Sequence, residues 1–167
     1  RYQWVLFMKQ LFKNHPAKNP IYGTPEAIKT ITRKDIVDYY EKYYKPNNMI
    51  ISIVGNVKDA EQKIEEKFTF QPKETGKREK IQEPEMEKTE TMSQTRDILQ
   101  SYMMMGYKTV PRLHEDSYAL DVIRSILGRG QSSRLFDEIR TKRGLAYSLG
   151  VVHDPETDYG WIGVYVG

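Results

Sequence analysis

Residues 116–166 read DSYALDVIRSILGRGQSSRLFDEIRTKRGLAYSLGVVHDPETDYGWIGVYV and carry the clearest structural signals in the chain. Apolar side chains recur at helical spacing over 116–127, and Gly128 follows as a helix stop. A Gly/Ser-rich turn at 128–133 then precedes a second predicted helix over 133–142, with a serine at its start. Residues 116–142 are therefore predicted to form two short helices joined by a tight turn.

Two strands are predicted next, over 145–153 and 159–166, because apolar residues dominate both runs and the turn-rich DPETD separates them. A further strand is predicted over 98–107, ahead of the first of these helices. Strands and helices mixed in this order predict an α+β sandwich, in which helices cover a sheet.

Helix signals also mark the first half of the chain. Apolar residues at 4, 5, 8, 11 and 12 lie on one helical face, and Thr24 precedes a proline as a helix cap would. Thr32 and Asp35 have the spacing of a capping box. The run at 49–54, MIISIV, is almost continuously apolar and predicts a strand buried on both faces.

A polar stretch at 71–96 separates the two halves. It holds six basic and six acidic side chains, two prolines and no aromatic residue, so it cannot bury enough apolar surface to offset the entropy of ordering. We therefore expect one domain portion over 1–70, a charged linker over 71–96 and a second domain portion over 97–167. Because the chain starts with Arg1 inside a predicted element, we expect it to be a fragment of a longer protein.

Composition excludes several classes of function. The 167 residues have a net charge of +3 with both signs interleaved, which argues against a nucleic-acid-binding module. There is no cysteine for disulfides or thiolate zinc sites, and no apolar run approaches the ~20 residues of a membrane-spanning helix. The histidines at 15, 114 and 153 lack the short spacing of a ligand motif, so no metal ligand is predicted in this chain.

Three segments resemble one known family. Residues 127–148 (LGRGQSSRLFDEIRTKRGLAYS) resemble the second-domain signature of insulinase/pitrilysin-type zinc peptidases, which include the mitochondrial processing peptidases. Residues 32–57 resemble the segment that closes the first domain, and residues 14–24 (NHPAKNPIYGT) resemble the loop before it. Ala17 and Lys18 depart from the Tyr-Gly that is usual in that loop.

The resemblance implies parts of two similar domains with the layered α/β sandwich of metalloproteases that carry an inverted zinc motif. In the family, that His-x-x-Glu-His motif and a later Glu hold zinc in the first domain, upstream of Arg1 in this numbering. Zinc is thus implied as the cofactor of the full-length protein, with its ligands outside this chain. The resemblance also implies a peptide or protein substrate and a homo- or heterodimer of two-domain subunits.

Arg140 and Tyr147 match the family's Arg and Tyr, which are seven positions apart. The resemblance implies that they face the zinc site from another domain and hold the substrate near the scissile carbonyl. A guanidinium and a phenol both donate hydrogen bonds to a carbonyl oxygen that becomes negative during hydrolysis. The alternative is structural: Arg140 pairs with Asp137, and Tyr147 packs in the core.

The turn holding Gly128, Gly130, Ser132 and Ser133 matches a glycine-rich loop that touches substrate in processing-peptidase relatives. The resemblance therefore implies a substrate-binding role for these four residues. An ordinary helix stop followed by a helix cap explains the same residues equally well.

The leading hypothesis is a fragment of a bacterial zinc-dependent metalloendopeptidase that cleaves extended or unfolded peptides. This portion would position substrate through Arg140 and Tyr147, and would be inactive alone. The alternative is a non-catalytic homologous subunit that binds substrate or supports assembly of a peptidase complex. The sequence leaves the cytoplasm and the periplasm both open.

Overall fold

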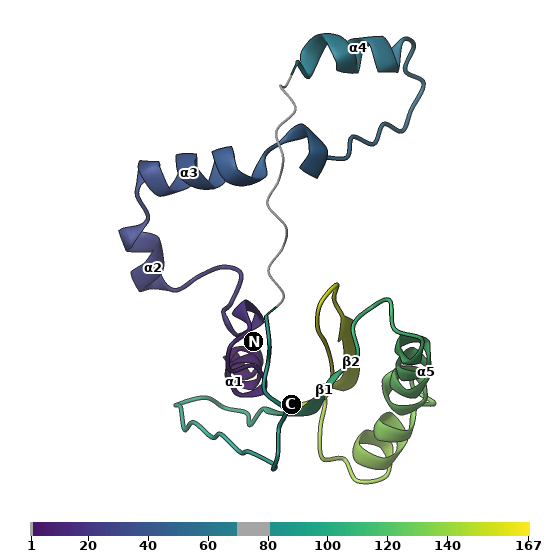
Figure 1. Ribbon diagram of the computed structural model, residues 1–167. Helices are drawn as coiled ribbons and strands as arrows, with labels where there is room; N and C mark the ends of the chain where they lie inside the picture. The colour runs from purple at the N-terminus through teal and green to yellow at the C-terminus, as the bar shows by residue number, and fades with distance from the viewer. Residues whose placement is uncertain (1, 70–80) are drawn as a thin grey trace. The chain divides into compact units, whose positions relative to one another are not determined.

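The computed structural model describes residues 2–69 and 81–167 (Figure 1). Contacts group Arg1–Ile21 with Lys80–Gly167 in one unit, and Tyr22–Glu79 form a second unit. The helix predicted at the start of the chain thus belongs with the C-terminal sheet. The proposed division into domains at 71–96 remains a prediction, and residues 71–80 of that linker lie outside the described part.

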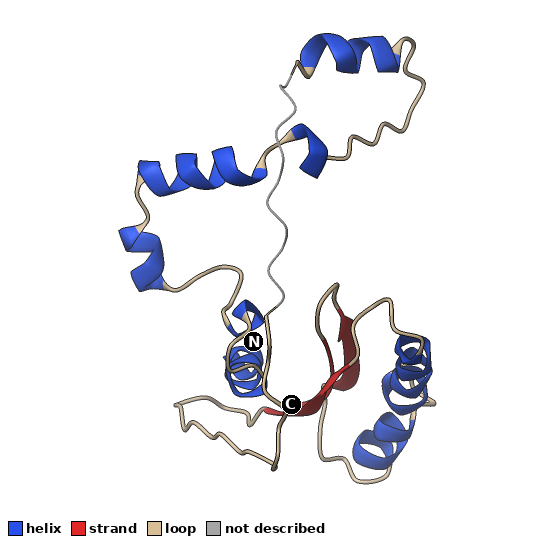
Figure 2. Ribbon diagram, viewed as in Figure 1, coloured by secondary structure: helices blue, strands red, loops and turns tan. Residues whose placement is uncertain are grey.

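The larger unit is built on an antiparallel sheet (Figure 2). Its strands are β1 (Met103–Thr109), β2 (Leu149–Pro155) and β3 (Gly160–Val166), in the spatial order β1-β3-β2. Of the predicted turn DPETD, Asp154 and Pro155 belong to β2, and the turn runs over 156–159, where the N–H of Glu156 bonds the carbonyl of Tyr159 at 2.7 Å. This confirms the α+β class, with helices packed on a small antiparallel sheet.

Helix α1 (Tyr2–Leu11) packs on one face of this sheet. Its apolar side supplies Trp4 and Phe7, whose rings lie 5.8 and 5.4 Å from the ring of Trp161 on β3. Leu11 and Phe12 complete the buried cluster around Trp161. Edge-on aromatic pairs of this kind add to the free energy of area burial, so these contacts fix α1 on the sheet.

Helix α5 (Asp116–Gly128) contacts β2, and the register places its contacts on the opposite face from Trp161. Val151 and His153 lie on this face, and His153 bonds Asp121 of α5. The order is therefore helix, sheet, helix, as predicted for the sandwich.

Three boundaries differ from the sequence prediction. The first strand runs from Met103 to Thr109 instead of over 98–107, and β2 starts at Leu149 instead of 145. The predicted helix over 133–142 is mostly a π-helix, η3 (Phe136–Thr141). Periodicity in a single sequence does not reveal such a local change of hydrogen bonding or strand register.

The second unit holds α2 (Pro25–Thr30), α3 (Arg33–Tyr43) and α4 (Ala60–Lys67). Both predicted starts are confirmed: Thr24 caps α2, and Thr32 forms a capping box with Asp35. Two short 3₁₀ turns complete the described elements, η1 (Pro16–Lys18) in the first unit and η2 (Pro46–Asn48) in the second.

The predicted strand at 49–54 is wrong for this chain. Residues 50–54 have no regular secondary structure and are exposed. A buried strand needs neighbouring strands for its backbone groups, and no described residue pairs with this segment. The apolar run alone therefore predicts that this segment is buried, but the described residues do not cover it.

The described part of the predicted linker contacts the segment that follows α1 through Glu83. Its carboxylate accepts backbone N–H bonds from Lys13, Asn14 (2.8 Å) and His15 (2.7 Å), and Lys108 on β1 forms an ion pair with it at 3.4 Å. Partial burial by itself would raise the pKa of Glu83, but these hydrogen bonds and the lysine charge lower it below its ordinary value. One linker residue is thus fixed on the folded unit.

Candidate functional site

Arg140 and Tyr147, predicted as a pair from the resemblance, are in contact. A guanidinium nitrogen of Arg140 donates to the backbone carbonyl of Tyr147 at 3.0 Å. The same guanidinium lies 4.6 Å from the ring centre of Tyr147 and 4.9 Å from that of Phe136. Two aromatic faces and a carbonyl therefore hold the arginine.

The π-helix and the turn after it create this arrangement. Within η3 the N–H of Lys142 bonds to the carbonyl of Asp137 at 2.9 Å, a spacing of five residues. Gly144 then adopts φ +60°, the left-handed conformation that glycine tolerates, and turns the chain back. Tyr147 follows in the bend before β2, not on the strand as expected.

The structural alternative for this pair is contradicted. Tyr147 is 79% exposed, so it does not pack in a core. Asp137 forms an ion pair with Lys142 at 2.8 Å, and Glu138 bonds Lys142 at 2.6 Å. These two carboxylates hold the pKa of Lys142 above its ordinary value. Both carboxylates bond Lys142, whereas the Arg140 guanidinium contacts the rings of Phe136 and Tyr147.

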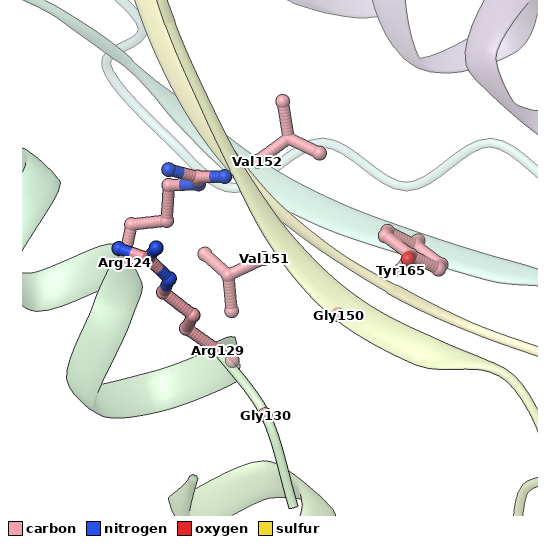
Figure 3. A pocket seen from close by; sticks show the side chains of 8 residues that line it. Arg124, Arg129, Gly130, Gly150, Val151, Val152 and Tyr165 are labelled. Carbon is pink, nitrogen blue, oxygen red and sulfur yellow. The ribbon is translucent and has the colours of Figure 1, made fainter.

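A second feature is a cavity of about 300 Å³ between the end of α5 and β2 (Figure 3). It is lined by Arg124, Gly128, Arg129, Gly130, Gly150, Val151, Val152 and Tyr165. The Arg124 side chain extends toward β2, and the Arg129 side chain extends back along α5 toward Arg124. Two of the four turn residues predicted to bind substrate, Gly128 and Gly130, thus lie at this cavity.

Gly128 is required by packing, because a Cβ there would lie 2.6 Å from the backbone nitrogen of Val151. Gly130 is required by conformation, since its φ is +79° while a Cβ would meet nothing within 4 Å. Ser133 is buried and its hydroxyl donates to the carbonyl of Gly130 at 2.8 Å, so it closes the turn. Ser132 is exposed.

Sequence reasoning missed four residues that contribute to these features. Phe136, which stacks on Arg140, was read only as part of a helix. Arg124 precedes the glycine-rich turn in the sequence and Arg129 lies within it, which was the available signal for a charged cavity. Tyr165 joins the cavity only through the pairing of β3 with Gly150, and a single sequence does not give that register.

The described residues do not fit a zinc site. Over 2–69 and 81–167, no group of three or more His, Asp or Glu side chains is placed to hold a metal ion. In the same ranges, no helix is long and apolar enough to cross a membrane. What the site can do is donate hydrogen bonds, from the Arg140 guanidinium and the exposed Tyr147 phenol, to an oxygen of a bound molecule.

Comparison with known proteins places this geometry in a family. The model of the peptidase M16 inactive domain matches residues 30–167. The uncharacterized zinc protease YmxG of Bacillus subtilis is 33% identical over 162 residues, which cover 97% of this chain and 39% of that protein. An uncharacterized zinc protease of Mycobacterium leprae is 32% identical over 96% of this chain and 37% of its own length. The chain thus spans less than half the length of these relatives.

Solved structures share the fold. A protease from Helicobacter pylori superposes with a TM-score of 0.90 at 24% identity, over 99% of this chain and 42% of that one. A peptidase M16 inactive domain from Pseudomonas fluorescens gives 0.78 at 22% identity, over 99% and 40% of the two chains. Because the family model covers most of the chain and close relatives align along nearly all of it, the chain belongs to the peptidase M16 family and contains its inactive domain.

Proposed function

We propose that this chain is the substrate-positioning portion of a zinc-dependent metalloendopeptidase that cleaves extended or unfolded peptides. In this proposal the zinc ligands lie elsewhere in the full-length protein, where bound zinc polarises the scissile carbonyl and activates water. Two findings support this separation of substrate positioning from zinc binding: the relatives are named zinc proteases, and the chain matches the inactive domain.

The contact between Arg140 and Tyr147 is the observation that carries the proposal. Arg140 is oriented by the Tyr147 carbonyl and by two rings, while the Tyr147 side chain is directed to solvent. π-helical turns are rare and occur frequently at functional sites, because they place a side chain where an α-helix would not. A pre-oriented arginine beside an exposed phenol suits an oxygen that gains negative charge.

The proposed chemistry for these residues is binding and charge stabilisation. The Arg140 guanidinium and the Tyr147 hydroxyl donate hydrogen bonds to the substrate near its scissile carbonyl. Neither group needs to gain or lose a proton, since both donate in their ordinary protonation states. We propose that they act on a zinc site of another domain, either in the same chain or in the partner of a two-domain dimer.

Steady-state kinetics of the full-length protein on a quenched-fluorescent peptide test this assignment. Arg140→Ala and Tyr147→Phe are each expected to lower kcat by about 10²–10³, the usual cost of losing one oxyanion contact. Arg140→Lys is expected to recover little, because an ammonium lacks the planar fork. Arg134→Ala and Tyr118→Phe, which change exposed residues outside the pair, are the controls. Unchanged kinetics in both test variants would exclude the role.

A second candidate is a non-catalytic subunit that binds substrate for a peptidase partner. The family model itself is described as an inactive domain, and this chain covers under half of its curated relatives. In that case the full-length protein would bind peptides without cleaving them until mixed with an active subunit.

A further inference from the structure

We propose that Lys142 is a positioning residue, because it binds two neighbouring carboxylates that would otherwise compete for the Arg140 guanidinium. The carboxylates belong to Asp137 and Glu138, whose oxygens lie 2.8 and 2.6 Å from the ammonium nitrogen. This inference deepens the proposed function and rests on it for the role of Arg140 in binding substrate. Lys142 does not touch substrate in this proposal and acts only through Arg140.

The wide turn of η3 determines which side chains meet. In an α-helix, residues three or four apart are neighbours, so Asp137 would lie beside Arg140. In η3 the backbone N–H of Lys142 instead bonds the carbonyl of Asp137, five residues earlier, at 2.9 Å. The side chains of these two residues meet at the same spacing, and no described ion pair joins Asp137 to Arg140. The π-helix thus pairs Asp137 with Lys142.

The contacts of Arg140 leave it able to bind a further oxygen. Its guanidinium carbon lies 4.9 Å from the ring centre of Phe136 and 4.6 Å from that of Tyr147. One of its nitrogens donates to the Tyr147 carbonyl at 3.0 Å, and a guanidinium has five N–H donors in all. A carboxylate at the same guanidinium would take two of these donors, because arginine and carboxylate form paired hydrogen bonds. Substrate and a nearby carboxylate would therefore compete for Arg140.

Asp137 depends on Lys142 for a cation. Glu138 has a second partner, Arg143 at 3.6 Å, whereas Lys142 is the only cation that the described part of the chain pairs with Asp137. Hydrogen bonds to the two carboxylates raise the pKa of Lys142 above its ordinary value, which keeps the ammonium charged. Without Lys142, Asp137 would carry an unpaired charge three residues before Arg140, a spacing at which side chains on a helix can meet.

The effect of losing Lys142 is expected to be smaller than the effect of losing Arg140 itself. Lys142, Asp137 and Glu138 are each about half exposed, and exposed ion pairs are weak because water and salt screen them. A competing pair between Asp137 and Arg140 would therefore occupy the guanidinium only part of the time. Partial loss of turnover, reversed when the competing carboxylate is removed, is the pattern that distinguishes this role.

Peptide kinetics of the full-length protein provide the first measurement. K142Q is expected to lower kcat/KM about fivefold, in keeping with the weakness of exposed ion pairs. K142R is expected to restore most of the activity, because a guanidinium also binds carboxylates, and K142Q/D137N is expected to restore it by removing the competing charge. The control K34Q removes an exposed lysine that pairs with Asp38 on α3, and it is expected to leave the kinetics unchanged.

Arginine side-chain NMR of the same proteins detects the orientation of Arg140 without requiring catalysis. The Nε–H signal of Arg140, identified by its loss in R140K, is expected to be displaced by ring currents, because the guanidinium lies close to the rings of Phe136 and Tyr147. K142Q is expected to move this signal toward the position of an ordinary exposed arginine. K142Q/D137N is expected to return it.

A signal that moves in K142Q and returns in K142Q/D137N supports the inference. A signal that stays in place in K142Q, or that D137N does not return, would overturn it whatever the kinetics show. If the signal behaves as expected but R140A cleaves peptide as well as the native protein, Lys142 still orients Arg140 and the proposed function is wrong. If R140A loses turnover while the signal stays in place in K142Q, the proposed function stands and this inference is wrong.

Discussion

His153 shows how a single residue depends on its partner across the sandwich. Its side chain is completely covered, and its Nδ1 lies 3.0 Å from a carboxylate oxygen of Asp121 on α5. Its Nε2 is buried and has no hydrogen-bond partner among the described residues. The Asp121 contact therefore provides the one hydrogen bond that the structure describes for this ring and joins α5 to β2.

Asp121→Ala is expected to lower the free energy of unfolding by about 1–2 kcal/mol, because it leaves both ring nitrogens of a buried imidazole without a partner. Denaturant unfolding of the full-length protein measures the change. Asp38→Ala is the control, since it removes an exposed carboxylate that pairs only along its own helix with Lys34, and it is expected to be nearly neutral. Equal effects of the two substitutions would contradict the role given to Asp121.

The turn after α5 shows how two glycines can be needed for different reasons at the scale of an element. Gly128 allows α5 to approach β2 closely, whereas Gly130 supplies a positive φ in open space. The sequence predicted that both glycines lie in a turn after a helix. It could not distinguish a glycine that ends a helix from a glycine that allows a close contact. Only the position of Val151, set by the tertiary fold, reveals the difference.

Gly128→Ala is expected to cost about 2–3 kcal/mol of stability, because the methyl group would overlap the backbone of Val151 and α5 must shift. Gly130→Ala is expected to cost about 1 kcal/mol, since only backbone strain opposes it. Thermal unfolding of the two variants in parallel measures the order. A larger loss at Gly130 would mean that α5 does not approach β2 as described.

Glu83 connects another element, the charged segment, to the end of α1. A carboxylate whose pKa is lowered by folding stabilises the folded state fully above its unfolded pKa, and this contribution disappears as the pH falls through the folded value. The stabilisation from Glu83 is therefore present at neutral pH and begins to decline near its ordinary pKa of 4.5.

Glu83→Gln is expected to reduce stability by about 1–2 kcal/mol at pH 7, because it removes the charge that accepts three backbone N–H bonds while the side chain is only 13% exposed. The difference from the native protein is expected to shrink as the pH falls below 4.5. Unfolding midpoints of both proteins from pH 7 to pH 3 provide the measurement. A pH-independent difference would argue against the charged contact.

Local signals account for the elements that the sequence predicted well. The caps at Thr24 and Thr32 act within one turn, and α5 repeats its apolar residues over three turns. The apolar run at 49–54 led to a wrong strand prediction, because the burial of a strand depends on neighbouring strands. The π-helix at Arg140 was missed for a related reason: hydrogen bonding between residues five apart leaves no mark in residue type.

At the scale of the whole molecule, the family and the α+β class followed from the motifs, and the comparisons confirm both. The contact between Arg140 and Tyr147 agrees with their predicted pairing, although their action on substrate remains a proposal. The cavity with Arg124 and Arg129 was not predicted, because it depends on the distance between α5 and β2. Residues that lie on several elements can be assigned to one site only when their positions in the folded chain are known.

We propose that this chain supports a zinc site that the rest of the full-length protein holds. Zinc content per chain, measured on native full-length protein and on Arg140→Ala purified without added metal, tests it most directly. One zinc per chain is expected in both proteins, with peptide turnover lost only in the variant. Absence of zinc from the native protein after supplementation, or loss of zinc in Arg140→Ala, would contradict it.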